Sequence, residues 1–434
     1  MTLVRNFPLI LLYLIYLFHI SFAPFPTQLR TRLILGIFGI CCITYLFVTK
    51  KEIQLNKNIF PIISFLLGII LFSITTSIIN LSLDIWFIQY AVQSMFFLLA
   101  AYFVILITFN SFKSGLKFLQ LIKFIVLSIV VHNIITIILF LVPSANSFFT
   151  SIQNYDELAS STISNVSRFS SRFIGLGIGS FFSGGLLCGY GILLSTYIIK
   201  NSPENTQKIK YIFVFLFLTI SSLFIARTSL IGSILGLTYL LWPQDLKIYI
   251  NKRTIVATTI FYTFILTIIV SISFYIFFYP PAWFKANAVE QAFELFTNIS
   301  SSGQLQTKST NALQEMYIFP DNIKTWIIGD GQFNLNGGMT YYMLTDVGYS
   351  RLLFYFGILG TSMFLGLQII LVFIIGKLSN STQIKRMMFL SITYSLILNL
   401  KGLADVNFYL YLLLWFFIFT YNIESKRSLA ETKN

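Results

Sequence analysis

YIFVFLFLTISSLFIARTSLIGSILGLTYLLW, residues 211–242, is an apolar stretch with a single charged side chain, Arg227. One helix of this length would extend ~48 Å at ~1.5 Å per residue, whereas the hydrocarbon core of a bilayer is ~30 Å thick. The segments before and after it are both basic, and basic segments belong on the same side of a membrane. The sequence therefore predicts two short crossings that form a hairpin, with Arg227 at its outer tip.

Similar apolar stretches occur along the whole chain, and most of them are long enough to cross a bilayer. Twelve stretches lack Asp, Glu, Lys and Arg: 7–29, 33–49, 59–83, 85–112, 124–155, 173–199, 211–226, 228–244, 254–284, 352–376, 387–400 and 406–423. We therefore predict an all-α polytopic membrane protein with about twelve transmembrane helices. Residues 7–22 also fit a signal peptide loosely, and cleavage there would leave the remaining topology unchanged.

The distribution of charge supports this topology. If the N-terminus is cytoplasmic, the inner segments carry nineteen Lys and Arg residues against five acidic ones, and the outer segments carry ten of each. The whole net charge of +14 then lies on the inner side, as the positive-inside rule predicts. Both termini are expected in the cytoplasm. Nucleic-acid binding, the usual alternative for so basic a chain, loses its support.

The sequence offers little for metal or nucleotide chemistry. Its three cysteines lie in apolar stretches without zinc-ligand spacing, and its two histidines, His19 and His132, lie in predicted helices. The chain has no nucleotide-binding glycine motif. We therefore expect neither a metal nor another cofactor.

Two long outer segments divide the chain into three predicted parts. A transmembrane bundle of nine helices spans residues 1–279 and includes a smaller outer loop at 143–171. A large outer loop or cap follows at 280–350, and helices ten to twelve with a cytoplasmic tail occupy 351–434. The large loop is rich in aromatic residues and carboxylates, which suit the C–H faces and hydroxyls of a sugar. Alternatively, its aromatic residues form a small core and an interfacial belt.

Basic residues on the outer side are mainly arginines, six Arg to four Lys, whereas the inner side has four Arg and fifteen Lys. A guanidinium group binds phosphate oxygens with two parallel hydrogen bonds, so this preference suggests phosphate recognition. The candidates beside predicted outer membrane boundaries are Arg168, Arg172, Arg227 and Arg351. Alternatively, these arginines extend from the membrane edge to water, or pair with Asp346 and Glu157.

Three segments resemble the O-antigen polymerase (Wzy) and O-antigen ligase family of bacterial envelope enzymes. Residues 224–230, FIARTSL, are similar to the family's Ser-Arg-Thr-Ala turn between two short helices. Residues 326–331, WIIGDG, are similar to its Gly-x-Gly near the end of the large periplasmic loop. Residues 346–352, DVGYSRL, are similar to the start of the helix that follows that loop. The resemblance implies a GT-C-like fold in the bacterial inner membrane, with a periplasmic active site.

The activity that the resemblance implies is metal-independent glycosyl transfer. A polymerase moves a growing O-antigen or capsular glycan from its undecaprenyl-pyrophosphate carrier onto a new lipid-linked repeat unit. The implied partners are these lipid-linked glycans, membrane lipids and a chain-length regulator. Fixed arginines can stabilise the negative charge that grows on the departing pyrophosphate. We predict that Arg227 and Arg351, with Arg172 or Arg168, clamp it.

The catalytic base follows from a departure from the family pattern. Ligases have a histidine before the helix that follows the large loop, whereas this chain has Asp346 there and no histidine in the loop. This argues against a ligase and leaves Asp346 first, and Glu315 second, to orient or deprotonate the acceptor hydroxyl. Tyr349 is expected to contact the substrate.

Three alternatives stay open. Asp346 can instead cap the helix that begins beside it. The whole protein can be an O-antigen ligase, or a non-enzymatic flippase or transporter of lipid-linked oligosaccharides. Transporters usually have ionisable residues near the membrane midplane and repeated halves, and this sequence has helices almost free of charge and no evident repeat.

Overall fold

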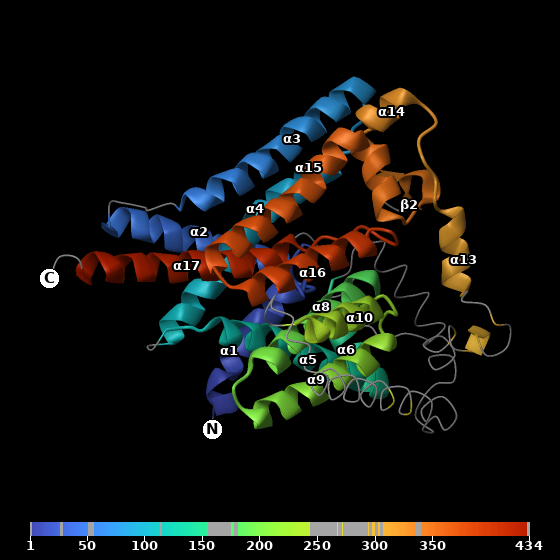
Figure 1. Ribbon diagram of the computed structural model, residues 1–434. Coiled ribbons are helices and arrows are strands. Elements are labelled where there is room, and N and C mark those ends of the chain that lie inside the picture. The colour runs from blue at the N-terminus through green and yellow to red at the C-terminus, as the bar shows by residue number, and fades with distance from the viewer. Residues whose placement is uncertain are drawn as a thin grey trace. The chain divides into compact units, whose positions relative to one another are not determined.

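The structure is a computed structural model of the chain, and it is mostly helical (Figure 1). It describes residues 2–26, 29–50, 56–112, 115–154, 175–177, 181–243, 267, 271, 294, 297–299, 303, 307–335 and 340–431. The chain divides into two compact units. Unit 1 comprises Met1–Phe118 and Leu313–Asn434, and unit 2 comprises Leu119–Ala312. The predicted division at residues 279 and 350 stays a prediction.

Two helices make most of the contacts within unit 1, α4 (Trp86–Ser111) and α15 (Gly348–Ser379). Helix α4 packs against α2, α3 and α17, and α15 packs against α3, α14, α16 and α17. Its elements are α1 (Thr2–Leu17), α2 (Thr31–Lys50), η1 (Lys57–Ile59), α3 (Phe60–Asn80), α4 (Trp86–Ser111), α14 (Ile323–Ile327), β1 (Asn334–Leu335), β2 (Thr340–Tyr341), η3 (Tyr342–Leu344), α15 (Gly348–Ser379), α16 (Thr382–Leu398) and α17 (Asn407–Glu431). Strands β1 and β2 pair antiparallel, with Asn334 opposite Tyr341.

Unit 2 is a helical group in which α8 packs against both α9 and α10. Its helices are α5 (Phe118–Leu141), α6 (Pro143–Ile152), α8 (Phe181–Asn201), α9 (Asn205–Leu223), α10 (Ser229–Leu241) and the start of α13 (Lys308–Glu315). A Cβ atom on Gly232 of α10 would lie 2.4 Å from the carbonyl oxygen of Gly189 on α8. Glycine at this position therefore lets the two backbones approach closely, as is common between membrane helices.

The predicted all-α class with several membrane-length helices is confirmed. Within the described residues, seven helices are long and apolar enough to cross a membrane, and three more apolar helices are shorter. Eleven of the twelve uncharged stretches overlap at least one helix. The stretch 254–284 lies almost wholly outside the described residues, so the number of twelve crossings stays a prediction.

The division of residues 211–242 into two helices is also confirmed. Helix α9 ends at Leu223, and α10 begins at Ser229. The Thr219 and Ser233 hydroxyls lie 3.2 Å apart, one on each helix. The two helices are therefore neighbours, and Arg227 lies in the turn that joins them.

Helix α15 is broken at Gly357, which has φ 61° and ψ −165°. Residues other than glycine are strained in this region of backbone space. The N–H groups of Asp330 and Gly331 donate to the carbonyl oxygens of Phe354 and Tyr355 at 2.6 and 3.1 Å. The Gly-Asp-Gly turn thus satisfies carbonyl groups next to the break, and it holds the first part of α15 in place.

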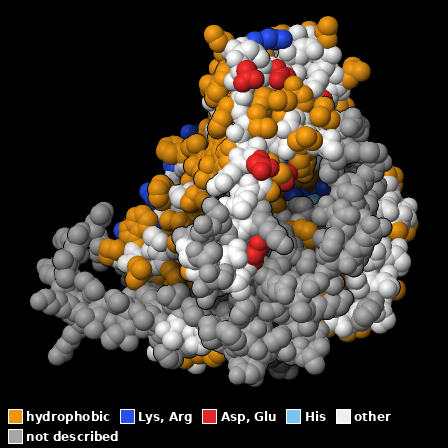
Figure 2. Space-filling view, turned by 90° about the vertical axis from the view of Figure 1, so that its right-hand side faces the viewer, with side chains coloured by type: hydrophobic (Ala, Val, Ile, Leu, Met, Phe, Trp, Pro, Cys, Tyr) orange, Lys and Arg blue, Asp and Glu red, His pale blue; other side chains and the backbone are white. Residues whose placement is uncertain are grey.

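Hydrophobic side chains cover much of the described surface (Figure 2). On α3, for example, Leu71 and Ile78 are 66% and 67% exposed. Large apolar surfaces on a protein mark sites of contact with lipid or with other proteins. Exposure along membrane-length helices is what lipid contact requires.

Candidate functional site

The predicted site residues fall into two groups, one in each unit. Arg227 lies in unit 2, whereas Asp346, Tyr349 and Arg351 lie in unit 1. Arg168 and Arg172 lie outside the described residues. The predicted clamp of arginines around one pyrophosphate stays a prediction.

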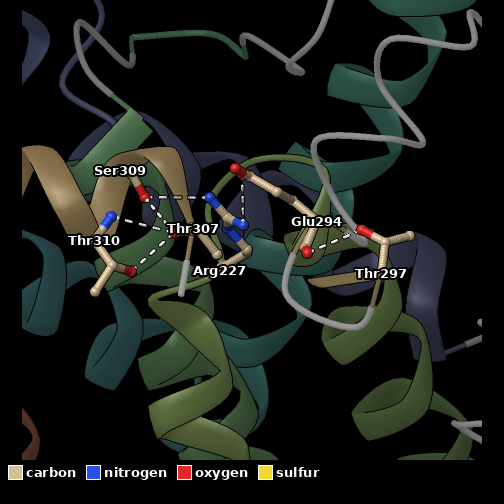
Figure 3. A network of polar contacts seen from close by, with 6 residues as sticks. All are labelled: Arg227, Glu294, Thr297, Thr307, Ser309 and Thr310. Atoms are coloured by element: carbon tan, nitrogen blue, oxygen red, sulfur yellow. Dashed lines mark hydrogen bonds and ion pairs between the residues drawn. The ribbon is translucent and has the colours of Figure 1, made fainter. Parts of the chain in front are cut away.

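In unit 2, Arg227 forms the centre of a polar network (Figure 3). Its Nη1 atom lies 3.1 Å from Oε2 of Glu294, and the two side chains are only 14% and 18% exposed. Its Nη2 atom donates to the Ser309 hydroxyl at 3.2 Å. The guanidinium is therefore held from two sides and largely shielded from water.

Hydroxyl groups at the start of α13 extend this network. The Thr307 hydroxyl lies 3.2 Å from that of Ser309 and 2.8 Å from that of Thr310. It also accepts the backbone N–H of Thr310 at 3.2 Å, which is the pattern of a helix N-cap. An arginine, several hydroxyls and the positive end of a helix dipole form a setting that favours an anion.

The turn that carries Arg227 is fixed by its own serines. Ser229 Oγ donates to Ser222 Oγ at 2.7 Å, and it also lies 2.9 Å from the carbonyl oxygen of Ala226. Thr228 is buried, and its hydroxyl has no hydrogen-bond partner within the described part of the chain. The turn thus holds the arginine rigidly and leaves one buried hydroxyl beside it unused.

Glu294 was missed as a site residue by the sequence analysis. The sequence shows it only as one of the carboxylates of the large loop. No spacing or motif connects it with Arg227, because the two residues belong to different segments. Only the folded chain shows that Glu294 supplies the countercharge.

In unit 1, Arg351 lies in an aromatic setting. Its guanidinium carbon is 3.9 Å from the ring centroid of Phe333 and 3.6 Å from that of Tyr341, and the residue is 8% exposed. Both contacts are cation–π interactions. Its Nε atom has no hydrogen-bond partner among the residues that the structure describes. The guanidinium group is therefore held by two aromatic rings, while its Nε atom is unused.

Asp84 positions this aromatic setting, and the sequence analysis did not single it out. Its Oδ2 atom accepts the N–H groups of Phe333 and Asn334 at 2.7 and 3.1 Å. Its Oδ1 atom accepts the N–H of Trp86 at 2.9 Å, at the start of α4. The indole of Trp86 in turn stacks on Phe333, with 3.9 Å between centroids. One carboxylate thus joins the α3–α4 connection to β1.

Asp346 lies just before α15. The residue is exposed overall, yet nearby protein atoms desolvate its carboxyl and raise its pKa above the usual value, against the opposing effects of Arg351 and Lys401. Helix α15 begins after Val347 without a side-chain capping bond, so the alternative in which Asp346 caps the helix is wrong. A raised carboxyl pKa is the direction expected of a general base.

Tyr349 and Glu315 have simpler surroundings. The Tyr349 hydroxyl donates to the carbonyl oxygen of Leu396 at 2.8 Å, and its backbone N–H donates to that of Asn399 at 3.2 Å. These bonds attach the start of α15 to the end of α16. Glu315 is exposed at the last position of α13. These hydrogen bonds give Tyr349 a structural role. Its expected contact with substrate stays a prediction.

Several loop residues contact one another. Trp326 donates through Nε1 to the carbonyl oxygen of Pro320 at 2.7 Å, and its ring stacks on Phe319 with 6.2 Å between centroids. Asp330 accepts hydroxyl hydrogen bonds from Thr325 at 2.6 Å and from Tyr342 at 3.2 Å. For these residues the structure agrees with the alternative of a small loop core.

The two arginine centres are the strongest candidates for a site in the described chain. Within those residues, no group of three or more His, Cys, Asp or Glu side chains is placed to hold a metal ion. No protein-family model, curated protein or solved structure matches this chain.

Proposed function

We propose that this protein polymerises undecaprenyl-pyrophosphate-linked oligosaccharide repeat units of O-antigen or capsular polysaccharide at the periplasmic face of a bacterial inner membrane. The observation that carries the proposal is the network around Arg227. It combines a shielded guanidinium, hydroxyl donors and a helix start in a chain with membrane-length helices. This combination suits a phosphate group attached to a lipid. The family resemblance supplies the reaction.

In the proposed reaction, a hydroxyl of the new repeat unit attacks the anomeric carbon of the growing glycan. The bond from this carbon to the pyrophosphate oxygen breaks, and its electron pair stays on the leaving pyrophosphate. The proton of the attacking hydroxyl passes to a carboxylate, for which Asp346 is the candidate. Arg227 stabilises the leaving group without a metal, because a fixed cation needs little rearrangement as the charge develops.

Before substrate binds, Glu294 is the charged partner of Arg227. Its carboxylate keeps the guanidinium paired at 3.1 Å. A pyrophosphate carries more negative charge than one carboxylate and offers more acceptor oxygens for a guanidinium fork. Substrate therefore replaces Glu294 as the main partner of Arg227, while the bond to Ser309 helps to keep the arginine in position.

The experiment that tests the proposal replaces Arg227 in a host whose own copy is deleted. Deletion should reduce the glycan ladder of the host to lipid-linked material with a single repeat. Arg227→Ala should restore less than about one hundredth of the polymer, the loss expected from one donor to a developing anion. Arg227→Lys should restore an intermediate amount, since an ammonium keeps the charge but not the fork.

The matched control is Lys377→Ala, at an exposed lysine near the end of α15. It should restore the full ladder, and all variants should be present in membranes at equal amounts. A full ladder from Arg227→Ala would reject the proposed site. Loss of every repeat on deletion of the protein would instead indicate a ligase or a flippase.

A further inference from the structure

A row of side chains in unit 1 connects Arg351 with the start of α17. We call it the aromatic strip, and it consists of Tyr341, Arg351, Phe333, Trp86, Tyr90 and Asn407. The indole of Trp86 stacks on Phe333 and on Tyr90, with 3.9 and 5.9 Å between centroids. Asn407 then donates through Nδ2 to the Tyr90 hydroxyl at 2.8 Å. The members of the strip therefore contact one another in turn from Tyr341 to Asn407.

Hydrogen-bonding groups along this strip are buried but unused. Within the described residues, no partner is present for Nε of Arg351, Oδ1 of Asn407, Oδ1 of Asn334 or the hydroxyl of Ser350. Asn407 and Ser350 are fully buried. Two of these atoms belong to the strip, and Asn334 and Ser350 are the chain neighbours of Phe333 and Arg351. Buried polar atoms are almost always hydrogen-bonded, so these exceptions require an explanation. A ligand that forms these bonds explains them.

The chemistry of these groups distinguishes between ligands. The two asparagine oxygens only accept hydrogen bonds, so they need a ligand with O–H or N–H donors. A pyrophosphate at neutral pH offers mainly acceptors. The nearby charges also disfavour it, since Asp346 acts electrostatically on Arg351 and Asp405 Oδ1 accepts the N–H of Asn407 at 2.8 Å.

A sugar ring satisfies both kinds of group. Its hydroxyls donate to amide oxygens, and its ring and hydroxyl oxygens accept from a guanidinium edge. The rings of Phe333 and Tyr341 lie against the guanidinium of Arg351, and its buried Nε atom has no partner within the described residues. Trp86, Tyr90 and Tyr341 are partly exposed, which leaves aromatic surface for the C–H face of a sugar.

We propose that the aromatic strip binds a sugar ring, neutral or acidic, to which Arg351 donates from its edge and from which Asn407 Oδ1 accepts a hydroxyl. Arg351 is then a sugar-binding residue, and the pyrophosphate belongs to the network of Arg227 in unit 2. The inference rests on the proposed function only for the statement that the sugar is part of a lipid-linked glycan. Binding of a free sugar does not require polymerase activity.

The test measures binding to the purified full-length protein in detergent. The sugar probes are the methyl glycosides of glucose, galactose, N-acetylglucosamine, glucuronic acid and galacturonic acid, followed by saturation-transfer NMR. Inorganic pyrophosphate is the anion probe, followed by calorimetry. At least one sugar should bind, and Arg351→Gln and Asn407→Ser should each weaken its binding at least tenfold. Arg227→Gln should still bind the sugar but should no longer bind pyrophosphate.

Two results would overturn the inference. One is that no sugar of the panel binds, and the other is that Arg351→Gln loses pyrophosphate while any sugar binding is unchanged. A weaker signal from acidic than from neutral sugars, or the reverse, identifies the type of sugar. Thermal unfolding of each variant, and rescue by Arg351→Lys of part of the sugar binding, separate loss of contact from loss of fold. Sugar binding in a protein whose deletion leaves the host's ladder intact would reject the proposed polymerase alone.

Discussion

Two buried arginines of unit 1 have similar aromatic surroundings but differ in whether the Nε atom has a hydrogen-bond partner. Arg32 is 3% exposed and lies near the rings of Tyr16, Phe97 and Phe408, with 4.4 Å to the nearest centroid. It donates to the carbonyl oxygens of Tyr16 and Leu17, both at 2.7 Å, and so closes the end of α1. Arg351 has two rings but an unused Nε. Burial alone therefore does not separate a structural arginine from a candidate ligand-binding one, and the unused Nε is what makes Arg351 the candidate.

The largest expected effect on stability tests this contrast directly. Arg32→Met should lower the free energy of unfolding by about 4 kcal/mol, because each hydrogen bond from a charged donor contributes roughly 1.5–3 kcal/mol. Arg351→Met should change it by less than about 1 kcal/mol, since apolar contacts replace the cation–π contacts. Thermal unfolding of the purified variants measures both. Equal destabilisation would show that Arg351 is structural too.

A somewhat smaller effect is expected at the break in α15. Gly357→Ala should destabilise the protein by about 3 kcal/mol, because its positive φ is strained for alanine and a Cβ would lie 2.3 Å from the backbone of Ile327. Gly376→Ala is the control on the same helix. Its Cβ would meet only the Lys385 side chain, at 3.5 Å. If both variants unfold at the same temperature, the break does not hold the first part of α15.

A third effect concerns the carboxylate that positions Phe333. Asp84→Asn should lower the free energy of unfolding by about 2 kcal/mol, because the amide nitrogen that replaces one carboxylate oxygen cannot accept a backbone N–H. The same change should weaken sugar binding to the aromatic strip, since Phe333 lies against Arg351. Asp321→Asn, at an exposed position just before α14, should alter neither property. Normal sugar binding by Asp84→Asn would show that the aromatic strip does not depend on this carboxylate.

The smallest expected effect on stability depends on pH. The pKa of Asp346 is raised in the folded protein, so its ionisation weakens folding as pH rises above the usual carboxyl value. Asp346→Asn should therefore unfold at a slightly higher temperature than the unchanged protein at pH 7, and at the same temperature in acid. Its polymerisation should fall, because it has no base. The unchanged protein should lose activity as pH falls through the raised pKa.

The helices could be predicted from the sequence because each depends on the sum of many apolar side chains within one segment. The division at Arg227 was predicted for a similar reason, since the length of the apolar stretch and the charge of its flanking segments determine it. The position of Arg351 at the start of a helix after the large loop was predicted as well. These features need no knowledge of distant residues.

The partners of the site residues could not be predicted in this way. Glu294 beside Arg227 and Asp84 beneath Phe333 come from segments that the sequence does not connect. A hydrogen bond requires two atoms within about 3 Å, and no periodic pattern specifies such a distance between remote segments. The sequence by itself thus determined where the chain is apolar, where it turns and which cations lie at helix ends. The tertiary structure alone decided which of those cations are already satisfied and which still have a donor for a ligand.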